Sequence, residues 1–258
     1  MSIATEITRL QNAKAAIKTA IEGKGVTVPD ATLMDGMASL IDAIEAGGGD
    51  TTVEDSLVTR TVMEYTNSRV TSIGNYAFYW CYNLVSVNAP NVTSLGNYAF
   101  QYCSKLTTVD FPKATAVTDS VFRYCYSLTS VSVPLATYVS RYAFQYCSKL
   151  TTVDFPKATS IGTYAFANCS ALLTADFSQV TKIEYFAFQY CSKLTALVLR
   201  NTSEVCSLSG TSVLNYTPIA SGTGYIYVPD ALVDSYKAAT NWSTYAAQIK
   251  PLSEYTEA

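Results

Sequence analysis

The sequence contains no histidine, and this absence removes several kinds of chemistry at once. Serine and cysteine triads, histidine general bases and histidine metal ligands are all excluded. Charged residues make up 14% of the 258 residues, against roughly 25% in an average globular protein. Because the net charge is −3 and no Lys/Arg cluster is present, we expect no nucleic-acid partner.

The N-terminal stretch also lacks an apolar core. Residues 1–25 alternate charged and apolar side chains, without the apolar run of about 7–15 residues that a signal peptide needs. We therefore expect neither a signal peptide nor membrane insertion. The 49% of apolar residues are nevertheless enough for a substantial core over one or two domains. The twenty tyrosines are the compositional outlier.

A period of 22 residues dominates the chain. The segment 101–115 recurs unchanged at 145–159, which indicates duplication within this chain. Such a period is typical of a solenoid, in which stacked units share one core. The six units begin at Thr71, Thr93, Thr115, Thr137, Thr159 and Thr181. Three positions hold the same residue type in every unit. They are a phenylalanine (Phe78, Phe100, Phe122, Phe144, Phe166 and Phe188), a cysteine (Cys81, Cys103, Cys125, Cys147, Cys169 and Cys191) and a leucine (Leu84, Leu106, Leu128, Leu150, Leu172 and Leu194).

Each unit combines a strand with a return segment. Alternation in residues 106–111 predicts a strand with Val109 and Phe111 inward and with Thr108 and Asp110 outward. Apolar spacing in residues 161–169 favours a short helical turn on the opposite wall.

These residues resemble the BspA-type leucine-rich repeats, through the pattern Ile73-Gly74, Ala77-Phe78, Cys81, Leu84, Val87 and Pro90. The resemblance covers residues 53–200, with 53–70 as a degenerate first coil, and implies an α/β repeat solenoid. One wall would be a parallel β-sheet and the other would carry short helical returns. In the last unit Arg200 replaces the proline and residues 196–199 are all apolar, which is typical of an edge against which a cap packs. Residues 201–258, with a helix starting after Pro229, are similar to the C-terminal helical cap of such arrays.

Residues 1–46 form a different unit, separated by a Gly-rich linker at 47–52. Two apolar stripes predict a helical hairpin that is too small to hold a core alone, so we expect an attachment or oligomerisation module. The first stripe is similar to short helical modules of phage and prophage tail-associated proteins. The stripes contain Ile3, Ile7, Leu10, Ile17 and Ile21, and Leu33, Met37, Leu40, Ile41 and Ile44.

The cysteine column is predicted to be a buried column of reduced thiols. Side chains on successive coils lie about 4.8 Å apart, farther than a disulfide allows, and the chain has no C-x-x-C pair for a metal. We expect no metal and no cofactor. Cys206 lies outside the register and is expected to be the one exposed thiol.

Outward strand positions are the first candidate binding face, and a merely solvated sheet fits them equally well. Asp154 and Asp176 would lie on neighbouring strands at a spacing close to that of retaining glycosidases, but the open sheet offers no apolar pocket, so we expect no enzyme. The candidate residues are Thr108, Asp110, Ser130, Ser132, Thr152, Asp154, Thr174 and Asp176.

Aromatic columns are the second candidate. Tyrosine combines a hydroxyl tip with low rotamer entropy and suits contacts with sugars or proteins, although packing ladders explain at least one column better than a contact surface does. One column contains Trp80, Tyr102, Tyr124, Tyr146 and Tyr190, and the other contains Tyr76, Tyr98, Tyr142 and Tyr164.

Two functions remain, both without catalysis. The first is a phage or prophage tail-associated virion component that oligomerises through residues 1–46, binds other tail proteins and presents the repeats to a bacterial surface glycan or protein. It would assemble in the bacterial cytoplasm and leave by lysis. The alternative, which the repeat resemblance implies, is a bacterial cell-surface adhesin that binds host or matrix proteins.

Overall fold

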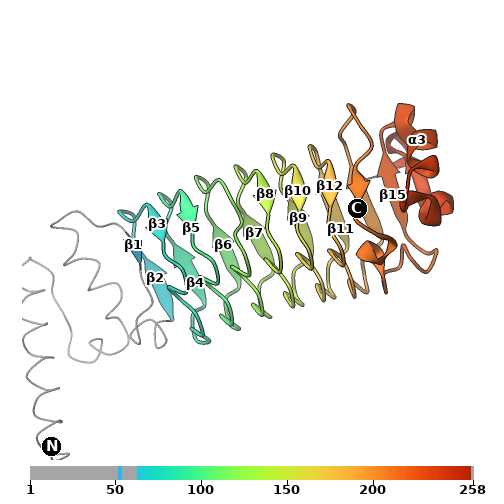
Figure 1. The fold of residues 1–258 in the computed structure, drawn as a ribbon. Helices are drawn as coiled ribbons and strands as arrows, with labels where there is room; N and C mark the ends of the chain where they lie inside the picture. The colour runs from blue at the N-terminus through green and yellow to red at the C-terminus, as the bar shows by residue number, and fades with distance from the viewer. Residues whose placement is uncertain (1–51, 54–62, 257–258) are drawn as a thin grey trace, which may run out of the picture.

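The computed structural model describes residues 52–53 and 63–256, which form a stack of coils with parallel strands (Figure 1). Each coil pairs with the next at the 22-residue interval; Ser86, for example, is aligned with Thr108 and Thr108 with Ser130. The predicted repeat fold is therefore confirmed. The predicted hairpin of residues 1–46 lies outside the described residues, as does half of the first coil, residues 54–62. Thr52, at the end of the predicted linker, pairs with Ser72.

The long strands build the first wall, as predicted. Their side chains alternate, so that Val109 is buried between exposed Thr108 and Asp110. The wall consists of two parallel sheets, in the orders β2-β4-β6-β7 and β9-β11-β13-β15-β16. Its strands are β2 (Glu64–Thr66), β4 (Ser86–Asn88), β6 (Thr108–Asp110), β7 (Ser130–Ser132), β9 (Thr152–Asp154), β11 (Thr174–Phe177), β13 (Ala196–Leu199), β15 (Tyr225–Val228) and β16 (Ile249–Pro251).

A second wall of strands was not predicted, so the expectation of sheet on one wall only is wrong. Two-residue strands at the start of five of the six units pair in parallel, and each places one apolar side chain, such as Ile161, in the core; the third unit has only a bridge between Val117 and Val139. These strands form the orders β1-β3-β5 and β14-β12-β10-β8. They are β1 (Thr52–Val53), β3 (Ser72–Ile73), β5 (Ser94–Leu95), β8 (Tyr138–Val139), β10 (Ser160–Ile161), β12 (Lys182–Ile183) and β14 (Ser207–Leu208).

The third wall consists of tight turns, and the prediction of short helical returns is wrong. No helix occurs between β2 and β14 in the described chain. Two residues of the turn, such as Tyr76 and Trp80, have φ values of 60° and 64°, which interrupt right-handed helix. Their N–H groups donate to Asn97 and Gln101 carbonyls of the next coil at 3.0 and 2.9 Å, instead of to residues in their own coil.

The core runs along the stack as columns of identical side chains. Phe100 stacks on Phe78 and Phe122 with ring centroids 5.0 and 5.4 Å apart, and the column continues to Phe188. The predicted thiol column is confirmed, because all seven cysteines are free and buried. The Cys103 thiol also donates to the Phe78 carbonyl at 3.1 Å, and the next four cysteines repeat this bond.

The C-terminal segment continues the stack and carries most of the helical structure described. The predicted helix start is confirmed, since η4 begins directly after Pro229. The predicted exposure of Cys206 is wrong. Its N–H donates to the Tyr236 hydroxyl at 2.9 Å, and its carbonyl accepts a bond from the Trp242 indole, so both buried rings cover it. The segment contains η3 (Thr211–Leu214), η4 (Asp230–Leu232), α3 (Val233–Ala238), η5 (Trp242–Gln248) and η6 (Leu252–Glu254).

Candidate functional site

The outward face of the long strands is polar, as the sequence predicts. Thr108, Asp110, Ser130, Ser132 and Thr152 are exposed. Toward the C-terminal end, Thr174 and Asp176 are half-buried, and the strand position of Asp154 is aligned with that of Asp176. The face then ends at β13, where Ala196 and Val198 are buried although they alternate with core residues, which fits the predicted apolar edge.

Asp176 is neutralised by an arginine from the next coil. The Arg200 guanidinium donates to both carboxylate oxygens, from Nε at 2.8 and 3.1 Å and from Nη2 at 2.6 Å. Arg200 also lies over the Tyr255 ring, 5.7 Å from its centroid. A carboxylate that is hydrogen-bonded to two nitrogens of one guanidinium is not available as the nucleophile of a glycosidase pair. The geometry therefore does not favour hydrolysis of a glycosidic bond here.

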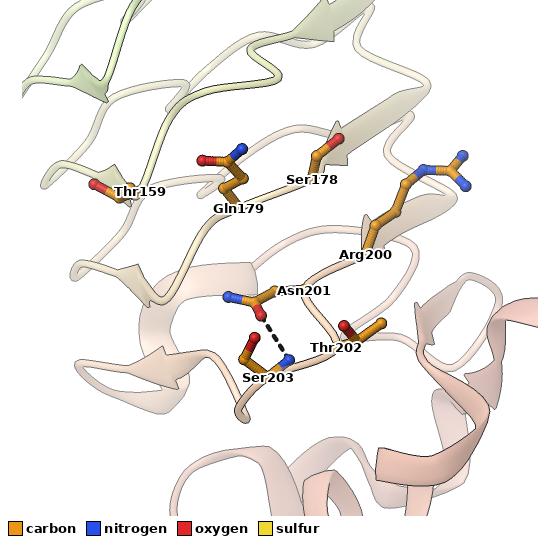
Figure 2. Close-up of a pocket in the computed structure, with 7 residues that line it drawn as sticks. All are labelled: Thr159, Ser178, Gln179, Arg200, Asn201, Thr202 and Ser203. Atoms are coloured by element: carbon orange, nitrogen blue, oxygen red, sulfur yellow. Dashed lines mark hydrogen bonds between the residues drawn. The ribbon is translucent and has the colours of Figure 1, made fainter.

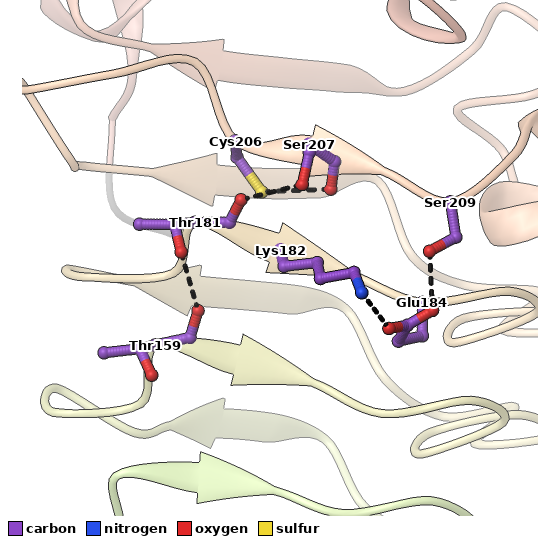
Figure 3. Close-up of polar contacts among 7 residues, drawn as sticks. All are labelled: Thr159, Thr181, Lys182, Glu184, Cys206, Ser207 and Ser209. Atoms are coloured by element: carbon purple, nitrogen blue, oxygen red, sulfur yellow. Dashed lines mark hydrogen bonds and ion pairs between the residues drawn. The ribbon is translucent and has the colours of Figure 1, made fainter.

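Many hydroxyls of the chain join successive coils. The Thr159 hydroxyl donates to the Thr137 carbonyl at 3.1 Å, and Thr181 and Ser207 extend the same column (Figure 3). Figure 3 also shows Glu184 between Lys182, 2.6 Å away, and the Ser209 hydroxyl. The pKa of Glu184 is lowered by the hydrogen bond from Lys182 and then by that from Ser209. These groups stabilise the stack and leave fewer hydroxyls for a ligand.

The predicted aromatic column forms a stacked ladder on the turn wall. Adjacent ring centroids are 4.5, 4.5 and 4.9 Å apart from Trp80 through Tyr102 and Tyr124 to Tyr146. The ladder resumes at Tyr190 after one missing ring. Burial raises the pKa of Tyr102, and the nearby Tyr124 raises it further.

The resumed part of the ladder contains a ring that the sequence analysis missed. Tyr216 stacks on Tyr190 at 4.4 Å, although it follows by 26 residues instead of 22. The matching signal was present, because residues 213–216 repeat the apolar-apolar-polar-Tyr order of 187–190. The Tyr190 N–H donates to the Asn215 carbonyl at 3.0 Å, as in the other coils.

The second aromatic column is a parallel ladder with a different interruption. Tyr142, Tyr164 and Phe186 stack at 5.3 and 4.7 Å, but Ser120 replaces the ring in the third unit. There Arg123 supplies a planar group. Its guanidinium lies 4.9 Å from the Tyr142 ring centroid and 4.8 Å from that of Tyr124.

Aromatic residues occupy backbone positions that usually favour glycine or asparagine. Trp80, Tyr102, Tyr124, Tyr146 and Tyr190 all have φ between 60° and 67°. A left-handed non-glycine residue costs about 1–2 kcal/mol, and such strain concentrates at functional sites. Stacking contributes about 0.5–1.5 kcal/mol for each ring pair, so a ring with two stacked neighbours recovers about that cost. Trp80 and Tyr190 nevertheless remain exposed, and exposed aromatic rings held in this way are an indication of a surface role.

Exposed aromatics widen this surface beyond the predicted column. Trp80 is 46% exposed, and Tyr82 and Tyr126, two residues after the ladder positions of their coils, are 53% and 43% exposed. In the coils without a tyrosine there, serine occupies the position. We call the turn-wall surface that includes the two ladders, Tyr82 and Tyr126 the aromatic wall.

Two open depressions lie away from the aromatic wall. One, of about 380 Å³, is lined by hydroxyl and amide side chains and by Arg200, between the turn after β11 and the loop after β13. In Figure 2 the Asn201 side chain accepts a hydrogen bond from the Ser203 N–H at 2.9 Å. The other, of about 510 Å³, lies on the short-strand wall. The charged side chains that line it form ion pairs with one another, as Arg141 does with Asp119 at 2.8 Å. The depression therefore offers no strong electrostatic attraction to a charged ligand.

No His/Cys/Asp/Glu cluster suited to a metal ion was found over residues 52–53 and 63–256. Within that same part of the chain, no helix has the length and apolar character needed to cross a membrane.

The stacked coils with parallel strands define a leucine-rich repeat protein. The chain belongs to the BspA type leucine-rich repeat region family, whose model matches residues 63–172 and 115–223 with six copies. Members of this family are generally non-enzymatic binding proteins. No curated protein matches the sequence significantly.

Several solved structures are similar to part of the chain. A leucine rich cell surface protein from Faecalibacterium prausnitzii is 23% identical over 66% of this chain and 55% of its own, with a TM-score of 0.46. A leucine-rich repeat protein from Bacteroides ovatus is 20% identical over 70% and 54%, with a TM-score of 0.46. The pneumococcal vaccine antigen PcpA is 11% identical over 74% and 66%, with a TM-score of 0.47. The chain thus spans about half the length of the first two structures.

Proposed function

We propose that this protein is a non-enzymatic binding protein of the cell-surface adhesin kind, and that the aromatic wall contacts its partner. The observation that carries the proposal is the series of exposed aromatic rings that left-handed backbone positions hold together on the turn wall, because exposed apolar surface of this kind marks interaction sites. Partners of this class are bacterial surface glycans and host or matrix proteins, and both suit tyrosine-rich surfaces.

Membership of the BspA-type family supports the adhesin alternative better than the virion-component interpretation. The virion interpretation rests on the apolar stripes of residues 1–46, which lie outside the described residues. Cell-surface localisation is therefore part of our proposal. The outward face of the long strands is the second candidate surface, with Thr108, Ser130 and Thr152 at its centre.

The domain organisation forms part of the same proposal. Residues 1–46 would serve as an attachment or oligomerisation module, residues 47–52 as a linker, residues 53–200 as the repeat array and residues 201–258 as its C-terminal helical cap. The burial of Trp242 and Tyr236 over Cys206 supports the last assignment. An oligomer would convert weak single contacts into avid binding.

The test is binding of the full chain to immobilised bacterial polysaccharides and matrix proteins, with one variant of each surface. The wall variant, Trp80→Asn with Tyr82→Ser and Tyr126→Ser, uses only residues that equivalent positions of other coils already contain. The matched control changes Thr108, Ser130 and Thr152 to alanine. We expect the wall variant to lose most binding and the control to retain it. The reverse result would assign binding to the strand face, and no binding by the wild type would contradict the proposal.

A further inference from the structure

The ladder of the aromatic wall has one missing ring, at Asn168. Tyr146 stacks on Tyr124 at 4.9 Å, and Tyr190 stacks on Tyr216 at 4.4 Å, but no ring contact joins Tyr146 to Tyr190 in the described chain. Each of these two rings therefore has a face toward Asn168 that no aromatic neighbour covers. Tyr190 is 45% exposed although Tyr216 covers its other face.

The gap has the width of one ring. Asn168 belongs to the coil between those of Tyr146 and Tyr190, since the Tyr146 N–H donates to the Ala167 carbonyl and the Asn168 N–H to the Gln189 carbonyl. Two coil spacings separate the ring planes by about 9.6 Å. A ring placed midway would lie about 4.8 Å from each tyrosine, within the usual range for stacked rings.

The residues next to Asn168 in its turn are small. The neighbouring turn positions contain Ala167, Ser170 and Ala171, whereas the equivalent positions two coils earlier contain Arg123, Tyr126 and Ser127. At the other interrupted ladder the Arg123 guanidinium stacks on Tyr142, so the chain itself fills that gap with a planar group. At Asn168 the small Ala167 occupies the place of that arginine.

The polar groups of the gap select a neutral ligand with hydroxyls. The Asn168 amide has both a donor and an acceptor, and its side chain makes no hydrogen bond within the described residues. The rings of the two adjacent coils, Tyr146 and Tyr190, carry hydroxyls that can also donate and accept, and that of Tyr190 is already hydrogen-bonded to the Tyr216 side chain. No carboxylate follows Asn168 in its turn to bind a cation.

We propose that the gap between Tyr146 and Tyr190 is a sugar subsite that clamps one pyranose ring of β-gluco configuration, with the Asn168 amide bound to its hydroxyls. A pyranose with only equatorial substituents has an apolar C–H face on both sides, as a slot with two aromatic walls requires. An axial hydroxyl, as in galactose, would place a polar group against one ring. This assignment rests on the proposed binding function of the aromatic wall and names one ligand class for it.

The test uses the full chain and methyl β-glucopyranoside, with saturation-transfer NMR as the readout. We expect the glucoside to bind weakly and methyl β-galactopyranoside to bind roughly five-fold more weakly or worse. Asn168→Tyr fills the gap and should abolish saturation transfer from the protein to the glucoside. Asn168→Gly keeps the left-handed backbone and the gap but removes the amide, and should weaken binding roughly five-fold. Ser104→Tyr, a tyrosine added elsewhere on the aromatic wall, is the matched control and should bind like the wild type.

Failure of the sugar assignment is separable from failure of the proposed function. If the folded wild type gives no saturation, binds both sugars equally, or binds an arginine amide instead, the sugar assignment is overturned. The same holds if Asn168→Tyr still binds the glucoside. The binding function itself stands in those cases if the wall variant, with Trp80, Tyr82 and Tyr126 replaced, still loses the macromolecular partner.

Discussion

Asn168→Tyr should stabilise the protein, which is unusual for a substitution in a binding site. The side chain of a tyrosine at this position would complete the ladder between Tyr146 and Tyr190. The centroids of adjacent rings in this ladder are 4.4–4.9 Å apart, so a ring between Tyr146 and Tyr190 would stack on both at about the usual distance. The backbone is already left-handed, with φ of 62° at Asn168.

The magnitude follows from two opposing effects. Two new ring contacts contribute about 0.5–1.5 kcal/mol each, or about 1–3 kcal/mol together. A left-handed tyrosine costs about 1 kcal/mol more than a left-handed asparagine, which tolerates this conformation. The expected net gain is about 1 kcal/mol, which raises the melting temperature by about 2–4 °C for a chain of this size.

Thermal unfolding followed by circular dichroism measures this gain. Asn168→Gly is the matched control, because it suits the left-handed backbone without adding a ring, and it should melt within about 2 °C of the wild type. If Asn168→Tyr melts below the wild type while Asn168→Gly does not, a tyrosine side chain does not fit between the rings. The gap would then not be open, and the sugar subsite would lose its geometric basis.

Further predictions concern the core and the C-terminal segment. Burial raises the pKa of the Cys103 thiol and, to about 12, that of Cys206, so the unfolded chain releases thiol protons that the folded chain retains. The melting temperature should therefore fall as the pH rises above about 8.5, the pKa of a free thiol, and native thiols should not react with Ellman's reagent until the chain unfolds. Trp242→Ala should cost about 3–5 kcal/mol in urea unfolding, because it removes a fully buried ring and the indole bond to the Cys206 carbonyl; Ser243→Ala, at an exposed neighbour, is the control. Arg200→Ala should cost about 1 kcal/mol by the same measurement, since the ion pair with Asp176 is partly exposed, and an unchanged stability would show that the fork contributes nothing.

The sequence predicted what a strict period determines. The 22-residue interval aligned identical residues on successive coils, so the thiol column, the core phenylalanines and the alternation around Val109 all followed. The aromatic columns followed for the same reason, and Tyr216 was missed because a four-residue insertion shifts it out of register.

The turn wall could not be predicted from the same pattern. Apolar spacing in residues 161–169 matches a helical face, but the left-handed residues Tyr164 and Asn168 prevent a helix. Tyrosine rarely adopts the left-handed backbone conformation, so the sequence of a single coil gives no indication that this residue is left-handed. The two-residue strands, such as β10, are too short to show alternation, and their pairing comes from stacking alone.

Footprinting of the bound complex tests the central claim most directly. The full chain, bound to whichever polysaccharide or matrix protein it captures, would be oxidised by hydroxyl radicals and compared with the free chain. The account predicts protection of Trp80, Tyr82 and Tyr126 on the aromatic wall. Tyr138 on the short-strand wall and Tyr225 on the long-strand wall are 41% and 37% exposed and should react as in the free chain. Protection of Tyr225 or Tyr138, with Trp80, Tyr82 and Tyr126 still fully oxidised, would contradict the account.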